Sequence, residues 1–348
     1  MSRTLCRFAW SVALIVLALP EWGGAAELDR YLPDDTDMVA SINVRQVIDS
    51  PVFQNYARDP LTAWLKTTPI PSVLGLVGLD PWKDVQRITL AGPGSNAVLD
   101  RWMAIGHGQF DRDRIERAAD LLTRVDTTIL KIHKDAPGAW WYEIHLKNYA
   151  HTLYAAFPDK QSVVVSTVPE WVHDALAEGQ GNKEASVNPD VKALVAKQND
   201  QQSIWLTGVP LDLVQKELAN NPRLQAMAAN VESFSGSVVL TTALRIELRI
   251  QTDNPRSGLR LRRFLELENA VAVLALRNNE NLQDVAPLLV GVLTSLRMTQ
   301  DGGTVVLGAT IPPHLIERWV QKEGFNRPPA PAPAPESLPA PKAGGTPP

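Results

Sequence analysis

One short stretch of the chain combines aromatic, acidic and imidazole side chains at a two-residue spacing. Residues 139–157 predict a β-hairpin, and side chains two apart on a strand share one face. Trp141, Glu143 and His145 therefore fall on the same face of the first strand. Tyr154, on the second strand, is predicted to join them. We take these four residues as the candidate binding site.

The pairing of the two strands follows from their apolar positions. A four-residue turn at residues 148–151 sets apolar side chains opposite one another, and this consistency is what fixes a register. The predicted cross-strand pairs are Leu146 with Leu153, Ile144 with Ala155, and Tyr142 with Phe157. The other face of the hairpin then carries the candidate site.

A surface of this composition suits stacking against a sugar or holding another polar ligand. Glu143 and His145 also have the side chains of an acid/base pair. Neighbours at positions i and i+2 are close on any strand, so their proximity alone is weak support for catalysis. The simpler interpretation is a half-exposed sheet face or a contact between two lobes. We assign no catalytic residue.

Other catalytic and cofactor motifs are absent from the sequence. It contains no His-Glu-x-x-His, no Gly-x-x-x-x-Gly-Lys and no Gly-x-Ser-x-Gly. Its one cysteine, Cys6, lies near the N-terminus. Once the first 26 residues are removed, a cysteine nucleophile, a zinc–thiolate site and a redox pair are all excluded. We therefore expect no cofactor and no metal.

The first 26 residues have the layout of a secretory signal peptide. Arg3 and Arg7 precede an apolar run at residues 8–19, and small residues follow at positions 24–26. The run is shorter than the about 20 residues that span a bilayer, so cleavage is favoured over a permanent anchor. We expect an exported, periplasmic or extracellular protein without a membrane span after cleavage.

The charge balance limits the class of partner. The chain has 34 Lys and Arg against 38 Asp and Glu, which is mildly acidic. This argues against nucleic acid or an anionic membrane as the main partner. A local basic cluster is formed by Arg256, Arg260, Arg262 and Arg263, and such a cluster is typical of a solvated helix face.

Composition divides the chain into five segments. After the signal at 1–26, we predict a first lobe at 27–180, a linker at 181–190 and a second lobe at 191–326. The tail at 327–348 is rich in proline and alanine, which predicts an extended, disordered segment.

The two lobes show a weak internal duplication. Thr167-Val168-Pro169 and Thr310-Ile311-Pro312 each follow a predicted strand and precede a predicted helix, 143 residues apart. Each half is predicted to run roughly β-α-β-β-α-β-β-α. The sequence thus predicts an α+β fold of two related lobes, each an antiparallel or mixed sheet with helices on one face, in ferredoxin-like style.

The start of the predicted mature chain carries one family resemblance. Tyr31-Leu32-Pro33-Asp34-Asp35-Thr36, followed by a strand at residues 38–44 and a helix from Arg45, resembles exported bacterial proteins of unknown function. These families, common in planctomycete-type bacteria, open with Leu-Pro-x-Asp-Thr before a strand. The resemblance covers about 20 residues; it implies export and an α+β fold, and it implies no activity.

These observations favour a non-enzymatic binding or scaffold protein of the cell envelope. Its partner would be an envelope protein or a polar or glycan ligand. One alternative is an exported hydrolase with scattered catalytic residues, which would require Glu143 and His145 to line a concave pocket. Another is an assembly subunit whose edge strands pair with neighbouring molecules.

Overall fold

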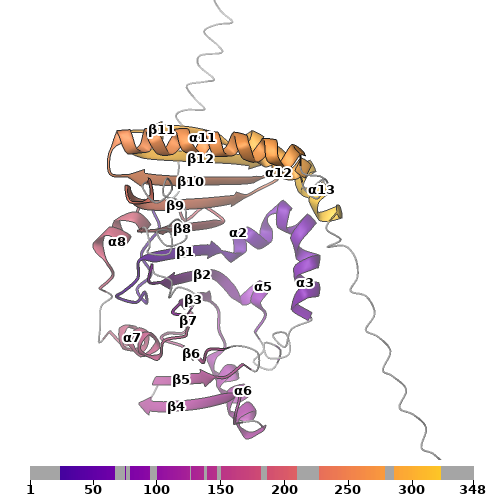
Figure 1. The fold of residues 1–348 in the computed structure, drawn as a ribbon. Coiled ribbons are helices and arrows are strands. Elements are labelled where there is room, and N and C mark those ends of the chain that lie inside the picture. The colour runs from indigo at the N-terminus through magenta and orange to yellow at the C-terminus, as the bar shows by residue number, and fades with distance from the viewer. Residues whose placement is uncertain are drawn as a thin grey trace, which may run out of the picture.

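Twelve described strands form one antiparallel sheet in the computed structural model (Figure 1). The structure describes residues 24–66, 75, 79–94, 100–125, 127–136, 139–146, 150–181, 186–209, 227–278 and 286–322. The predicted signal peptide, apart from its last three residues, and the predicted tail lie outside the described residues. The α+β class is confirmed, because helices accompany a large antiparallel sheet; these helices pack on both faces of the sheet and not on one face as predicted.

The strand order across the sheet is β11-β12-β10-β9-β8-β1-β2-β3-β7-β6-β5-β4. Every neighbouring pair runs antiparallel. The strands are β1 (Met38–Asn43), β2 (Val85–Gly92), β3 (Met103–Gly108), β4 (Leu130–Ala136), β5 (Ala139–Ile144), β6 (Leu153–Ala156), β7 (Ser162–Ser166), β8 (Ile204–Gly208), β9 (Val231–Leu240), β10 (Leu244–Thr252), β11 (Arg297–Asp301) and β12 (Thr304–Ile311).

The strand order is mirrored about the central pair β1 and β8, which join from Met38 opposite Gly208 to Ile42 opposite Ile204. Outward from this pair, one side reads β1-β2-β3-β7-β6 and the other reads β8-β9-β10-β12-β11. The hairpin of β4 and β5 extends the first side only. Strands from both predicted lobes thus lie in a single sheet.

The two faces of the sheet differ in polarity at its centre. We call the face that carries Val39 and Ser41 the Ser41 face, and the face that carries Ala40 and Ile42 the Ile42 face. Cross-strand neighbours share a face, so the register assigns every other strand residue to one of the two. On β1 the Ser41 face is buried, whereas the Ile42 face is only partly so.

Two helices cover the Ser41 face. Helix α7 (Pro169–Gly179) packs on β6 and β7, and α8 (Pro189–Val195) packs on β8 and β1. Both start with proline at the first turn, where a missing N–H disturbs no helical hydrogen bond. The main buried cluster lies here and joins both helices to the sheet; it includes Val39, Met103, Ile105, Val164, Trp171, Val172, Val191 and Val195.

Helices at both ends of the sheet cover the Ile42 face. Helix α6 (Arg112–Val125) packs on β4. At the far end, α11 (Pro255–Asn278) and α12 (Ala286–Ser295) lie over β10, β11 and β12 (Figure 1). The remaining helices are α2 (Val44–Asp49), the π-helix η1 (Phe53–Ala57), α3 (Arg58–Lys66), α5 (Pro81–Asp84) and α13 (Pro313–Lys322).

Local sequence explains how β1 passes into α2. The Asn43 side chain accepts a hydrogen bond from the backbone N–H of Gln46 at 3.1 Å, which caps the helix. Asp80 caps α5 in the same way through the N–H of Trp82, at 3.0 Å. The first cap fixes where β1 ends and α2 begins, and the second fixes the start of the short helix that precedes β2.

One sequence prediction about the hairpin of β5 and β6 is wrong. Ile144 pairs with Leu153 rather than with Ala155, so the register differs by two residues from the predicted one. The connection between the strands is longer than a four-residue turn, because β5 ends at Ile144 and β6 begins at Leu153. A shift of two leaves every side chain on its predicted face.

None of the described helices is long and apolar enough to cross a membrane. Helix α12, the apolar Ala286–Ser295, has only ten residues.

Candidate functional site

The four predicted binding residues lie together on the Ser41 face of β5 and β6. Glu143 is directly opposite Tyr154, and Trp141 lies two residues from Glu143 on the same strand. The strand β4, which the sequence analysis missed, adds Lys131 opposite Glu143 and His133 opposite Trp141. We call this group the histidine–tryptophan patch.

Glu143 is the centre of the patch. Its Oε1 accepts from the Nζ of Lys131 at 2.8 Å and lies 2.7 Å from the Nε2 of His145, while its Oε2 lies 3.1 Å from the Nε2 of His133. The hydrogen bond from Lys131 is the largest cause that lowers the pKa of Glu143 to about 2; burial opposes it, and the two histidines add to it. Glu143 is therefore ionised at neutral pH, which makes it a poor general acid.

Trp141 is already stacked within the protein. The His133 ring lies parallel to its indole, with centroids 3.6 Å apart and 3° between the planes. The His173 ring meets it edge-on at 4.9 Å. Because His133 covers one indole face, that face is closed to a sugar ring. Lys131, His133 and His173 are the residues around the four predicted ones that sequence reasoning missed, since they come from β4 and α7, which only the tertiary fold brings near.

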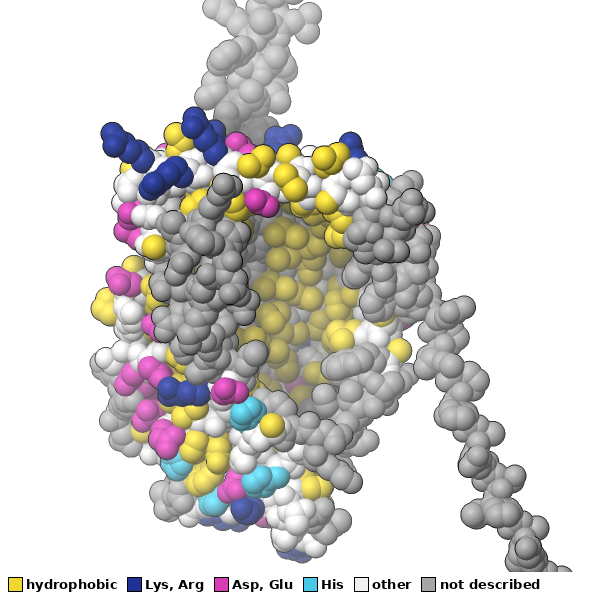
Figure 2. Space-filling view, viewed as in Figure 1, with side chains coloured by type: hydrophobic (Ala, Val, Ile, Leu, Met, Phe, Trp, Pro, Cys, Tyr) yellow, Lys and Arg dark blue, Asp and Glu magenta, His cyan; other side chains and the backbone are white. Residues whose placement is uncertain are grey.

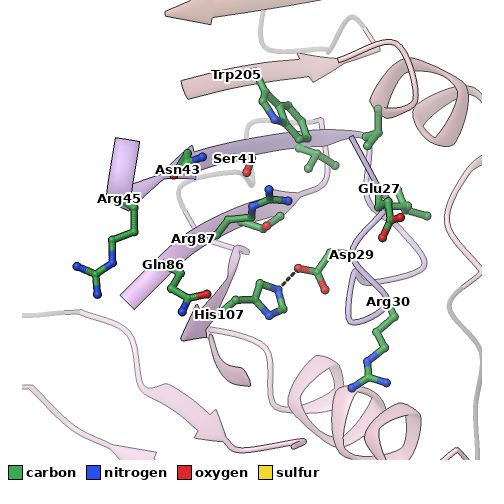
Figure 3. A pocket seen from close by; sticks show the side chains of 14 residues that line it. Glu27, Asp29, Arg30, Ser41, Asn43, Arg45, Gln86, Arg87, His107 and Trp205 are labelled. Atoms are coloured by element: carbon green, nitrogen blue, oxygen red, sulfur yellow. Dashed lines mark hydrogen bonds and ion pairs between the residues drawn. The ribbon is translucent and has the colours of Figure 1, made fainter. Parts of the chain in front are cut away.

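A separate, larger hollow lies at the centre of the Ser41 face. We call it the central pocket; its volume is about 720 Å³, and it is bounded by β1, β2, β3, β8, the end of α8 and the segment at 27–30 (Figure 3). None of the four predicted binding residues lines it. A smaller hollow of about 290 Å³ adjoins it and shares Arg30, Gln86 and His107.

The register of the sheet aligns the polar side chains of the central pocket. Asn43, Arg87 and His107 are cross-strand neighbours on β1, β2 and β3. The adjacent row carries Ser41 between β2 and β8, opposite Trp205. Strand pairing alone thus collects amide, guanidinium, imidazole and hydroxyl groups in one place.

His107 is held on both sides by hydrogen bonds. Its Nε2 lies 2.6 Å from Oδ2 of Asp29, and its Nδ1 lies 3.1 Å from the hydroxyl of Ser162 (Figure 3). This arrangement has the residue types of a hydrolytic triad. Ser162 is only 2% exposed, although it borders the smaller hollow. Its hydroxyl orients the imidazole of His107.

The arginines of the central pocket have different partners. Arg87 forms an ion pair with Asp200 at 3.1 Å, and Arg45 donates to the backbone carbonyl of Trp82 at 2.9 Å. Arg30 binds the carboxylate of Asp159 at the rim. With a backbone carbonyl as its recorded acceptor, Arg45 keeps donor capacity for a ligand.

The rim also contains a buried phenol. Tyr31 donates to Oδ2 of Asp159 at 2.8 Å. Burial, then the hydrogen bond to Asp159, raises the pKa of Tyr31 well above its ordinary value. Burial by itself would raise the pKa of Asp159, but hydrogen bonds from Tyr31, Gln161, Ser162 and Arg30 outweigh it and lower that pKa.

Among the described residues, no group of three or more histidine, cysteine or acidic side chains is placed to hold a metal ion.

Comparisons with known proteins assign no family to this chain. No protein-family model and no curated protein matches the sequence. Among solved structures, the chain is similar to that of crystal form I of TP0453, with a TM-score of 0.42 and 11% identity. The match covers 86% of this chain and 98% of that chain. So distant a likeness assigns neither a family nor a function.

Proposed function

We propose that the chain is an exported, non-enzymatic binding protein of the cell envelope, and that its ligand occupies the central pocket. The observation that carries this proposal is the row of Asn43, Arg87 and His107, which opens into a hollow of about 720 Å³. A few convergent polar groups in a concave site of this size are typical of a small-molecule site.

The pocket lining favours a hydroxyl-rich ligand. Arg45, Asn43 and Gln86 supply donors, and the carboxylates of Glu27 and Asp29 supply acceptors. Sugars present hydroxyl groups that both donate and accept. A sugar or sugar acid is therefore the ligand class that we propose.

Two features of the site support a binding role over hydrolysis. The lowered pKa of Glu143 makes its carboxylate a weak proton acceptor. In addition, neither Glu143 nor His145 lines either of the two described pockets. The hydrolase alternative depended on that placement.

We also propose that the two halves of the chain are related by duplication. The mirrored strand order about β1 and β8 supports this, since corresponding strands follow the same sequence order on each side. The helices α7 and α13 follow β7 and β12 in the same way. Two lobes of ferredoxin-like style, fused through one sheet, would have this arrangement.

An assembly role through edge strands has less support. The outermost strand β4 carries Lys131, His133 and Lys134, and charged side chains on an edge discourage pairing with another chain. The opposite edge, β11, carries Arg297 and Asp301.

Calorimetric titration of the purified protein with glucose and with glucuronate tests the proposed function. We expect one of them to bind, and Arg45→Ala to abolish the heat signal. Arg114→Ala is the matched control, because Arg114 is an exposed arginine on α6, away from the pocket. If neither probe binds, and native mass spectrometry of protein from its own source finds no bound small molecule, the proposal is wrong.

A further inference from the structure

Burial at the centre of the sheet is the reverse of what polarity predicts. On β2, the polar Thr89 is 4% exposed, whereas its apolar neighbour Leu90 is 40% exposed. On β8, Thr207 is fully buried, whereas Leu206 is partly exposed. Apolar side chains are thus left in contact with water on the Ile42 face, where burial would be favourable.

These exposed apolar residues form continuous rows across five strands. Each row follows the cross-strand register from β2 through β1, β8 and β9 to β10. One row is Leu90, Ala40, Leu206, Gly236 and Leu248, and the next is Ile88, Ile42, Ile204, Val238 and Ile246. None of these ten residues is buried. We call the surface that the two rows form the apolar hollow.

The space-filling view shows the apolar hollow as a recessed hydrophobic area below α11 (Figure 2). The small residues Ala40 and Gly236 alternate with the larger Leu90, Leu206 and Leu248, which leaves a depression on either side of Leu206. A flat partner surface would leave these depressions unfilled. A narrow, flexible occupant fits them better.

The lining of the apolar hollow selects for hydrocarbon. Each of the strands β2, β1, β8, β9 and β10 is paired on both sides, so their backbone groups are already hydrogen-bonded. The two rows contain no polar side chain. An extended peptide segment lying here would leave its own backbone groups unsatisfied, whereas an acyl chain requires no hydrogen bonds.

The dimensions agree with an acyl chain. Leu90 and Leu248 end a row that crosses four inter-strand spacings, which is about 19 Å at about 4.8 Å each. One leaflet of a bilayer has a hydrocarbon thickness of about 15 Å, half of the about 30 Å core. The row is therefore long enough for the acyl chain of a membrane lipid.

The outward face of α11 indicates the source of that lipid. Arg256, Arg260 and Arg263 are exposed on its first half. Leu267 and Leu274, 60% and 62% exposed, continue the same face on its second half. Arginines that complement anionic phosphates, next to leucines that enter the acyl boundary, are typical of a helix that lies on a membrane surface.

We propose that the apolar hollow binds an acyl chain of an anionic phospholipid, taken from a membrane surface that α11 contacts. This goes beyond the proposed function and uses the opposite face of the sheet from the central pocket. The basic cluster of α11, which the sequence predicted to be a solvated helix face, then contacts the phosphate headgroups of the membrane.

The test incubates the full chain with vesicles of phosphatidylcholine, with and without phosphatidylglycerol. Flotation measures contact with the vesicle, and mass spectrometry after gel filtration measures the phospholipid that stays bound. We expect flotation only with phosphatidylglycerol, its loss at high salt, and one bound phospholipid per chain.

A substitution that fills the apolar hollow with a side chain tests whether lipid binds there. A Cβ at Gly236 would meet the carbonyl of Glu247 at 3.8 Å and Leu248 at 3.9 Å, which are ordinary contacts. Gly236→Leu is therefore compatible with the backbone, and we expect it to reduce bound lipid by about tenfold or more. Gly308→Leu is the matched control, since Gly308 has open space and lies on the Ser41 face. Leu248→Gln provides a second variant if Gly236→Leu does not fold.

Reversing the charge on α11 tests the membrane contact. Arg260→Glu combined with Arg263→Glu should reduce flotation with anionic vesicles by about tenfold or more. The control is Arg114→Glu combined with Arg117→Glu on α6, which removes the same charge from another exposed helix face.

Three results would overturn the proposal: no flotation and no bound phospholipid, equal lipid loss in the Gly236 and Gly308 variants, or self-association that Gly236→Leu abolishes. The last result would assign the hollow to a second copy of the chain. Arg45→Ala should leave lipid binding unchanged, so a failure of sugar binding and a failure of lipid binding are distinguishable.

Discussion

His133 and Trp141 lie directly opposite each other on β4 and β5, and their rings are stacked in parallel with centroids 3.6 Å apart. Each belongs to a different part of the site: His133 also reaches Oε2 of Glu143, and Trp141 packs against the main buried cluster. The stacked pair therefore connects the polar patch to the core.

The stacking predicts a measurable coupling energy. In a double-mutant cycle of His133→Ala and Trp141→Ala, we expect urea denaturation to give a coupling of about 0.5–1.5 kcal/mol, the usual range for an aromatic pair. Additive effects of the two substitutions would contradict the stacking.

The lowered pKa of Glu143 predicts a dependence of stability on pH. Its folded pKa is about 2, below the ordinary value of 4.5, so its contribution is complete above that ordinary value and disappears as pH falls towards 2. Glu143→Gln should therefore lower the urea midpoint at neutral pH, with a difference that shrinks in acid. Glu247→Gln, at an exposed ion pair with Arg249 on the same sheet face, should change little at any pH. A deficit of Glu143→Gln that persists at acid pH would contradict this account.

The alternation of residues in β5 was sufficient to predict which side chains share a face. Trp141, Glu143 and His145 lie as predicted, and Tyr154 joins them although the register was wrong by two residues. The error was harmless because side-chain orientation repeats every two residues.

The central pocket was not predictable in the same way. His107 and Asp29 are 78 residues apart, and they meet because the segment at 27–30 lies beside β3 at the central pocket. The inverted burial of Thr89 and Leu90 was equally hidden, because alternation predicts that the apolar side is the covered one. Both depend on strand order and on helix placement, which are non-local.

Next to His107, at one end of the central pocket, the backbone at Gly108 packs closely against the backbone at Asp84. A Cβ on Gly108 would lie 1.9 Å from the carbonyl oxygen of Asp84, a distance that no side chain tolerates. Gly108→Ala should therefore lower the free energy of unfolding by at least about 2 kcal/mol. Gly308→Ala, at a strand glycine with nothing within 4 Å, should be neutral or stabilising by up to about 1 kcal/mol. Thermal unfolding of the two variants tests this prediction. Equal unfolding midpoints for Gly108→Ala and Gly308→Ala would contradict the close approach.

The rim of the central pocket gives a prediction with an internal control. Tyr31 and Tyr142 are both buried tyrosines, but only the hydroxyl of Tyr31 has hydrogen-bond partners: it donates to the carboxylate of Asp159 and accepts from the guanidinium of Arg30. Tyr31→Phe should lower the free energy of unfolding by about 1.5–3 kcal/mol, the range for a hydrogen bond to a charged group, whereas Tyr142→Phe should be neutral or stabilising.

The same pair of variants should respond differently to acid. The folded pKa of Asp159 lies below its ordinary value of 3.8, so the stability from its hydrogen bonds is present above that value and is lost as pH falls below it. The deficit of Tyr31→Phe should therefore narrow in acid, since the carboxylate that Tyr31 serves becomes protonated in the native protein too. Urea denaturation at neutral and at acid pH measures this directly. A deficit that is the same at both pH values would mean that Tyr31 acts through packing or through its hydrogen bond from Arg30, and Asp159 would then have no part in holding the rim.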